Sequence, residues 1–126
     1  MQGARLPLSS WRMGPVFKIF RIGEWQDFAK AGVFAGAGND RRDGFIHLSS
    51  AEQVAGTLAR HFSGDTLVVL AEIDAEALGG ALKREPSRNG ELFPHLYAPL
   101  LARAVLRAAR LTRAGAAFSL PDWFAS

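Results

Sequence analysis

The sequence predicts a protein of the α+β class. Short runs rich in β-branched and aromatic residues indicate strands, and segments with apolar residues three and four positions apart indicate helices. These elements do not alternate regularly as they do in a parallel β-α-β fold. The 126 residues are 48% hydrophobic and 21% charged, which is typical of one folded domain. We therefore expect a single domain over residues 16–126.

Residues 1–15 are expected to form a flexible N-terminal extension. They hold proline, serine and glycine among scattered leucines, without the continuous apolar run of a signal peptide. Because the ordered pattern begins directly after it, Met13 is a candidate for the true start. No segment approaches the roughly 20 apolar residues of a membrane span, so we expect a cytoplasmic protein with no membrane partner.

The first half of the domain predicts two strands and two helices. Residues 16–22 and 45–48 read as strands, and residues 24–31 as a short helix that ends at Gly32. Residues 32–44 are rich in Gly, Asn and Asp and are expected to be an irregular loop, which either connects elements or opens onto a site.

A second helix is expected to begin with a capping box and to run to Phe62. Ser49 would be its N-cap, and Glu52 would reach back to the amide of Ser49. Residues 66–74 give the strongest strand prediction, because an apolar run from Leu67 to Leu70 is typical of a central strand covered on both faces.

The last third of the chain predicts short elements. Pro94 and Pro99 exclude a long helix between them. The aromatic side chains near the C-terminus are expected to pack back on the domain. The expected order is a helical turn at 74–78, a strand at 81–85, a polar loop at 86–90, a strand at 104–112 and a tail at 115–126. The alanine and arginine content of residues 104–112 would also suit a helix.

Composition excludes several kinds of site. The chain has no cysteine, which excludes disulfides, thiolate metal sites and a cysteine nucleophile, and fits a reducing compartment. The net charge is only +3, which argues against a nucleic-acid partner. The arginines in the loops are better suited to the phosphates of a small ligand. These are Arg41, Arg42, Arg84 and Arg88.

His47 is the first candidate for chemistry. Strand alternation places Phe45, His47 and Ser49 on one face, and the apolar Ile46 and Leu48 on the face toward the core. His47 and Ser49 would then present a donor and an acceptor to one ligand. The alternative is a partly exposed strand histidine that bonds only to backbone.

A second group of candidates lies near residues 85–97. His95 and Tyr97 follow Pro94, so they either point into a site or tie down their own loop by hydrogen bonds. Glu85 and Glu91 flank the polar loop, and one of them would act as a general base or hold a sugar hydroxyl. The alternative is that both are exposed loop carboxylates without a role in a site. His61 is expected to lie beside Val54 and Leu58, at the boundary between the buried and the exposed face of the second helix. No pair of histidines has the spacing of a helical metal motif, so we expect no metal.

Two stretches resemble the signature of a small bacterial family known as domain of unknown function 952. They are Asp43–Val54, which reads DGFIHLSSAEQV, and Glu85–Tyr97, which reads EPSRNGELFPHLY. The likeness extends over about residues 16–112. One departure is visible, since the family usually has a tryptophan where this chain has Arg84.

This resemblance implies a fold similar to that of the ADP-ribosyltransferase superfamily, with two small twisted sheets, short helices and a central cleft. Members of that superfamily bind NAD, so NAD is the substrate that the resemblance implies. His47, Ser49, Glu85 and Glu91 would then be catalytic. The cofactor-binding residues would be Phe45, Arg88, His95 and Tyr97.

Three functions follow from the sequence. The first is an ADP-ribosyltransferase-like enzyme that uses NAD. The second is a non-catalytic module that binds a nucleotide-like small molecule in the same cleft. The third is a structural or interaction domain in which both motifs serve the fold. The protein would be a monomer or a small homo-oligomer in each case.

Overall fold

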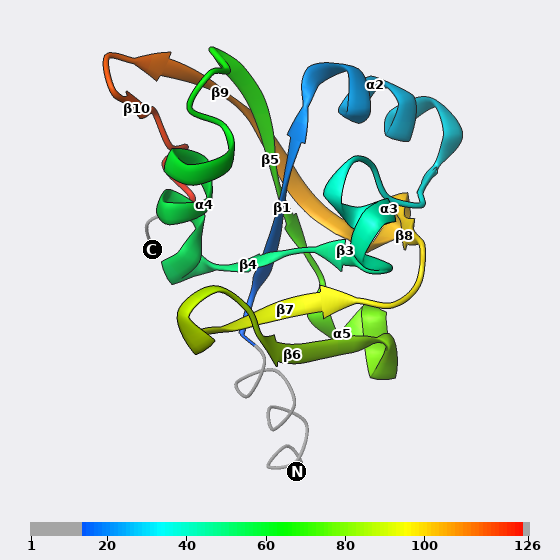
Figure 1. Cartoon of the computed structure of the whole chain (residues 1–126). Coiled ribbons are helices and arrows are strands. Elements are labelled where there is room, and N and C mark those ends of the chain that lie inside the picture. Colours follow the sequence, from blue (N-terminus) through cyan, green and yellow to red (C-terminus); the bar gives the residue numbers. More distant parts are fainter. Residues whose placement is uncertain (1–13, 125–126) are drawn as a thin grey trace, which may run out of the picture.

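A five-stranded antiparallel sheet forms the larger layer of the fold, in the order β10-β9-β5-β1-β4 (Figure 1). The computed structural model describes residues 14–124. The strands are β1 (Val16–Arg21), β4 (Ser49–Ser50), β5 (Leu67–Ile73), β9 (Val105–Ala114) and β10 (Ala117–Phe118). The predicted α+β class is confirmed.

A second, three-stranded sheet lies across one end of the first, in the order β3-β7-β6. Its strands are β3 (Ile46–His47), β6 (Leu82–Pro86) and β7 (Leu92–Leu96). A separate pair joins β2 (Val33–Phe34) to β8 (Leu100–Leu101). Only Leu48 separates β3 from β4, so one short segment of chain passes directly from the small sheet into the large one.

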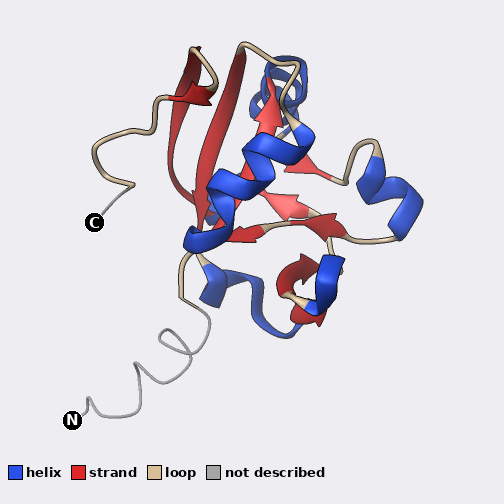
Figure 2. Cartoon of the chain, turned by 60° about the vertical axis from the view of Figure 1, so that its left-hand side comes forward, coloured by secondary structure: helices blue, strands red, loops and turns tan. Residues whose placement is uncertain are grey.

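Short helices surround the sheets, as Figure 2 shows. They are α2 (Ile22–Ala31), α3 (Asn39–Asp43), α4 (Val54–His61) and α5 (Ala75–Leu78). Four 3-10 turns connect other elements, namely η1 (Ala51–Gln53), η2 (Gly79–Ala81), η3 (Arg88–Gly90) and η4 (Ala102–Ala104). The helix α2 ends where predicted, because Gly32 adopts a left-handed conformation there.

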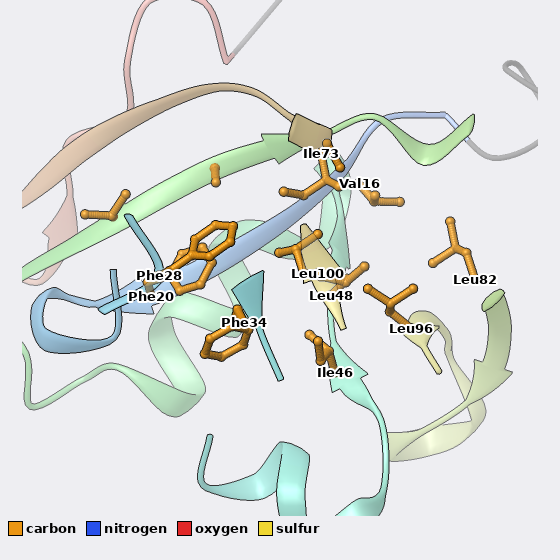
Figure 3. Close-up of a cluster of buried hydrophobic side chains, with 13 residues drawn as sticks. Val16, Phe20, Phe28, Phe34, Ile46, Leu48, Ile73, Leu82, Leu96 and Leu100 are labelled. Atoms are coloured by element: carbon orange, nitrogen blue, oxygen red, sulfur yellow. The ribbon is translucent and has the colours of Figure 1, made fainter. Parts of the chain in front are cut away.

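Two apolar clusters lie on opposite faces of the central strands. The larger cluster contains Val16 and Phe20 of β1 and is drawn in Figure 3. The smaller cluster contains Phe17 and Ile19, which point the other way because side chains alternate along a strand. Leu70 of β5 is fully buried, as expected of a strand with β1 and β9 on either side.

The aromatic tail packs against the smaller cluster, as predicted. Phe118, Trp123 and Phe124 all contact it. The rings of Phe124 and Phe17 meet edge to face with their centroids 5.2 Å apart. This contact covers a face of the large sheet that the strands alone would leave open.

The predicted capping box at Ser49 and Glu52 is wrong by one residue. Ser50 is the N-cap, and its backbone N–H donates to Oε1 of Gln53 at 3.0 Å. Ser49 belongs to β4 instead, where it pairs with Phe17. Its hydroxyl lies 2.9 Å from Oγ1 of Thr57, on the helix that follows.

The irregular loop expected at residues 32–44 is also corrected, because this segment contains β2 and the short helix α3. Gly38 precedes α3 and Gly44 follows it, both with positive φ angles of 50° and 87°. Glycine adopts such angles without strain, so the chain can turn sharply at both ends of a five-residue helix. The predicted extension at residues 1–15, and Met13 with it, lies almost entirely outside the described residues.

Candidate functional site

A cleft of about 790 Å³ opens beside β1, where β3 passes into β4. Its walls come from β1, α3, the segment from β3 to α4, and the start of β7. It is lined by polar side chains that include Lys18, Asp40, His47, Ser49, Glu91 and His95. Residues of both sequence motifs, Asp43–Val54 and Glu85–Tyr97, therefore line the same cleft.

His47 is held by two carboxylates of α3. Its Nδ1 lies 2.7 Å from Oδ1 of Asp40, and its Nε2 lies 3.0 Å from Oδ2 of Asp43. The backbone N–H of His47 also donates to Asp40 at 2.9 Å. An imidazole donates from both nitrogens only in its protonated form, so this arrangement satisfies the protonated ring.

Lys18 completes a buried charge cluster with Asp40. Its ammonium donates to Oδ2 of Asp40 at 3.2 Å and to the carbonyl of His47 at 3.1 Å. The lysine side chain is 10% exposed and the aspartate 5%. Burial lowers the pKa of Lys18 below its usual value, against the opposing charge of Asp40.

Asp40 accepts hydrogen bonds from three segments of the chain. Besides His47 and Lys18, the backbone N–H of Ala37 donates to it at 3.1 Å. Burial alone would raise the pKa of Asp40, but the bonds from His47 and Ala37 and the charge of Lys18 outweigh it. They lower that pKa from 3.8 to about 2, so the carboxylate stays charged.

His95 is held from one side only. Its Nδ1 lies 2.8 Å from Oε1 of Glu85, and the hydroxyl of Tyr97 donates to the same oxygen at 2.7 Å. The ring of Phe45 stacks on the imidazole with centroids 3.9 Å apart. The hydrogen bonds from Tyr97 and His95 lower the pKa of Glu85, and the bond to Glu85 raises the pKa of Tyr97.

The other ring nitrogen of His95 is the one buried side-chain polar atom without a hydrogen-bond partner among residues 14–124. The side chain is 5% exposed, so this nitrogen has little contact with bulk solvent. A buried polar atom left unsatisfied costs about 1–3 kcal/mol. Since Nδ1 donates to Glu85, Nε2 of a neutral His95 carries a lone pair that accepts a hydrogen bond.

His47 and His95 are direct partners across β3 and β7. Their ring centroids lie 5.7 Å apart with the planes at 69°. The cleft thus contains two imidazoles that face each other with different surroundings. His47 has carboxylates at both nitrogens, whereas His95 has one at Nδ1 only.

The structure brings some of the sequence candidates together and sets others apart. His47, Ser49, Glu91 and His95 line the cleft. Phe45 and Tyr97 line a separate, smaller hollow of about 400 Å³, which shares Asp40 with the cleft. Glu85 lies behind His95, and Arg88 begins the turn η3.

Sequence reasoning did not select Lys18, Asp40, Asp43 or Gln53. Gln53 is buried and donates to the carbonyl of Leu92 at 2.7 Å and to Glu91 at 3.0 Å, which joins η1 to β7. Lys18 did carry a signal, because a lysine in the middle of an apolar strand needs a buried partner. Asp40 carried none, since nothing local distinguishes it from a turn residue, and Asp43 was marked only as the first residue of the motif Asp43–Val54.

Two absences are limited to the described part of the chain. No three His, Asp or Glu side chains within it are grouped so as to hold a metal ion. None of its helices is long and apolar enough to cross a membrane.

The fold and its cleft define a small α+β protein with a two-histidine site. The chain belongs to the family described as protein of unknown function (DUF952), whose model matches residues 19–108. The resemblance to this family found in the sequence is therefore confirmed. A comparison with curated proteins finds no match.

Solved structures of a bacterial relative share the fold. The crystal structure of protein CC0527 from Caulobacter crescentus has 43% sequence identity and a TM-score of 0.82, covering 89% of this chain and 99% of that one. The solution NMR structure of CC0527 also has 43% identity, with a TM-score of 0.74 over 82% of this chain and 90% of that one. A likeness to ADP-ribosyltransferases is not among these findings and stays a prediction.

Proposed function

We propose that this protein binds a small polar molecule in the cleft between α3 and β7. The observation that carries the proposal is Nε2 of His95, a buried acceptor without a partner on the wall of a 790 Å³ cleft. The volume is typical of sites for small organic ligands, which take about 300–1,000 Å³. A hydroxyl or N–H group of the ligand would supply the missing donor.

The rest of the cleft suits a ligand with several polar groups. Lys18 uses two of its three N–H groups on protein atoms in the described chain, which leaves the third for an anionic or carbonyl oxygen. Glu91 and Asp43 line the same cleft, and their carboxylates can accept hydrogen bonds from hydroxyls of a ligand. A phosphorylated sugar or nucleotide has both kinds of group.

The resemblance noted in the sequence makes NAD and ADP-ribose the first ligands to test. In this proposal Ser49 and Glu91 contact the ligand beside His47 and His95, and Glu85 positions His95. Phe45 and Tyr97, which line the smaller hollow, would hold a part of the ligand that reaches toward it. ADP-ribosyl transfer is a further step, and release of nicotinamide from NAD would detect it.

The test is a thermal melt of the full chain with NAD, ADP-ribose or AMP at millimolar concentration. A ligand that binds only the folded state raises Tm, by an amount equivalent to about 2.7 kcal/mol at 100 times Kd. We expect at least one of the three to raise it. If all three leave Tm unchanged, the proposal fails and the motifs serve the fold.

The matched variants are His95→Phe and Arg110→Gln. Phenylalanine keeps a ring to stack on Phe45 but removes both the unpartnered Nε2 and the hydrogen bond from Nδ1 to Glu85, so Tm without ligand should fall only slightly while the ligand-induced rise is lost. Arg110 is exposed on β9 and does not line the cleft, so its variant should keep the full rise. A large loss of Tm in free His95→Phe would instead indicate a structural histidine.

A further inference from the structure

We propose that His47 and His95 are a general acid and a general base for cleavage of a phosphodiester. This inference rests on the proposed function, because it requires a ligand in the same cleft. It adds a reaction and a substrate class. The argument depends on the unlike hydrogen bonds of the two rings and on Lys18 beside them.

The hydrogen bonds favour different forms of the two imidazoles. His47 faces carboxylate oxygens at both nitrogens, at 2.7 Å and 3.0 Å, which a doubly protonated ring satisfies. His95 faces Glu85 through Nδ1 alone, and its Nε2 faces no donor or acceptor within the described chain. Paired groups whose surroundings favour opposite proton states are the usual arrangement of an acid and a base.

Each ring can reach a substrate through Nε2. On His47 this nitrogen bonds Asp43, whose side chain is 32% exposed, so a substrate oxygen can replace that carboxylate. Nδ1 stays bound to the buried Asp40 and keeps the ring oriented. On His95 the buried Nε2 has no partner within the described chain, and this role requires the side chains around it to shift when a substrate binds, as catalytic hydrogen bonds often tighten only in the complex.

The reaction balances with these two groups and a water molecule. The water oxygen bonds to phosphorus while its proton passes to Nε2 of His95. The bond from phosphorus to the leaving oxygen breaks, and that oxygen keeps the electron pair and takes the proton from Nε2 of His47. His47 then regains a proton and His95 loses one to solvent.

Lys18 favours a phosphate over an uncharged ester. Negative charge grows on the phosphoryl oxygens in the transition state, and a fixed cation stabilises it most where water is excluded. The lysine side chain is 10% exposed and held in place by Asp40 and by the carbonyl of His47, the residue that acts as the acid. Lys18 lines the cleft together with both histidines, and its ammonium also lies 5.5 Å from the centre of the Phe34 ring.

The first test is independent of any ligand. In ¹⁵N-histidine NMR spectra of the full chain, the two rings should differ: both nitrogens of His47 should show the shifts of hydrogen-bonded sites, whereas His95 should do so at Nδ1 only. His61→Gln and His47→Gln variants each remove one set of signals, and together they assign all three histidines. If His95 carries its hydrogen at Nε2, or if both rings show the same pattern, the inference is overturned even where ligands still raise Tm.

The second test is hydrolysis of bis(4-nitrophenyl) phosphate. His47→Gln and His95→Gln should each lower the rate by about 100-fold or more, within the range of general acid–base catalysis. Arg110→Gln should leave it unchanged, and a thermal melt confirms that each variant is folded. If the protein as it exists does not hydrolyse the probe, or if either histidine variant retains the full rate, the inference fails.

Two further variants separate catalysis from positioning. Glu85→Gln leaves both histidines in place but removes the carboxylate behind His95, so kcat should fall with little change in KM, and the Nδ1–H signal should shift. Hydrolysis of 4-nitrophenyl acetate is the comparison for substrate class. If the acetate is cleaved with the same dependence on the histidines and the phosphodiester is not, the assignment to phosphodiesters is wrong.

Discussion

Replacing Asp40 by asparagine should destabilise the protein strongly, because it leaves Lys18 charged and buried without its partner. The two side chains are 5% and 10% exposed and lie 3.2 Å apart. Removal of one member of a buried ion pair costs about 3–5 kcal/mol. That is a large share of the roughly 5–15 kcal/mol by which a protein of this size is stable.

The assay is urea unfolding of the variant and the parent protein. With an m-value of about 1.5 kcal/mol/M, a loss of 3–5 kcal/mol lowers the midpoint by about 2–3 M. The matched control is Asp43→Asn, which touches the same imidazole from its exposed side and should change the midpoint little. Both substitutions remove one negative charge from the same five-residue helix.

A double variant tests the cause. In Lys18→Met combined with Asp40→Asn, no charge remains buried, and such replacements are often neutral or stabilising. The double variant should therefore regain most of the stability lost in Asp40→Asn. If Asp40→Asn lies within about 1 kcal/mol of the parent protein, or if the double variant is no better, the cluster does not hold α3 as described.

Three other predictions concern pH, capping and the core. Folding lowers the pKa of Asp40, so its carboxylate contributes about 2 kcal/mol to the free energy of unfolding above pH 4. This contribution is lost as the pH falls from about 4 to 2, and the urea midpoint of Asp40→Asn should not show that loss. Gln53→Ala removes the side chain that caps η1 and joins it to β7, and should cost about 1–2 kcal/mol by urea unfolding; an unchanged midpoint would contradict the capping geometry. Leu70→Ala in the central strand should cost about 2–5 kcal/mol, whereas Leu106→Ala, at a residue 58% exposed, should leave Tm nearly unchanged, and equal effects would refute the strand order.

The strands were predictable because burial leaves a local pattern in the sequence. The apolar run from Leu67 to Leu70 indicated a strand covered on both faces, and Val69 packs in the larger cluster on one face while Val68 and Leu70 pack in the smaller cluster on the other. Alternation around His47 placed Ile46 and Leu48 in the core, where both are 2% exposed. These inferences need only the spacing of neighbouring residues.

The capping box shows where local pattern becomes ambiguous. Two frames overlap, Ser49 with Glu52 and Ser50 with Gln53, and both fit the same motif. Pairing of Ser49 with Phe17 of β1 keeps Ser49 in the strand and moves the cap by one residue. That pairing is between segments 32 positions apart, which no local motif encodes.

The charged part of the site was least predictable for the same reason. Asp40 acquires its role from Lys18 and His47, which belong to other elements. Glu85 meets His95 because β6 and β7 pair in a particular register, with Lys83 opposite His95 and Glu85 two residues further along. Sequence reasoning selected Glu85 and His95 separately, but only the fold shows that they are bonded.

The most direct test of the central claim is protein-observed NMR of the full chain during titration with ADP-ribose. If the cleft binds a small polar molecule through His95, the side-chain ¹⁵N signal of its Nε2 and the amide signals of His47 and Lys18 should move together and saturate. The same titration of His95→Phe should leave the amide signals in place. Shifts confined to residues outside the cleft, or the same response in His95→Phe, would contradict the account.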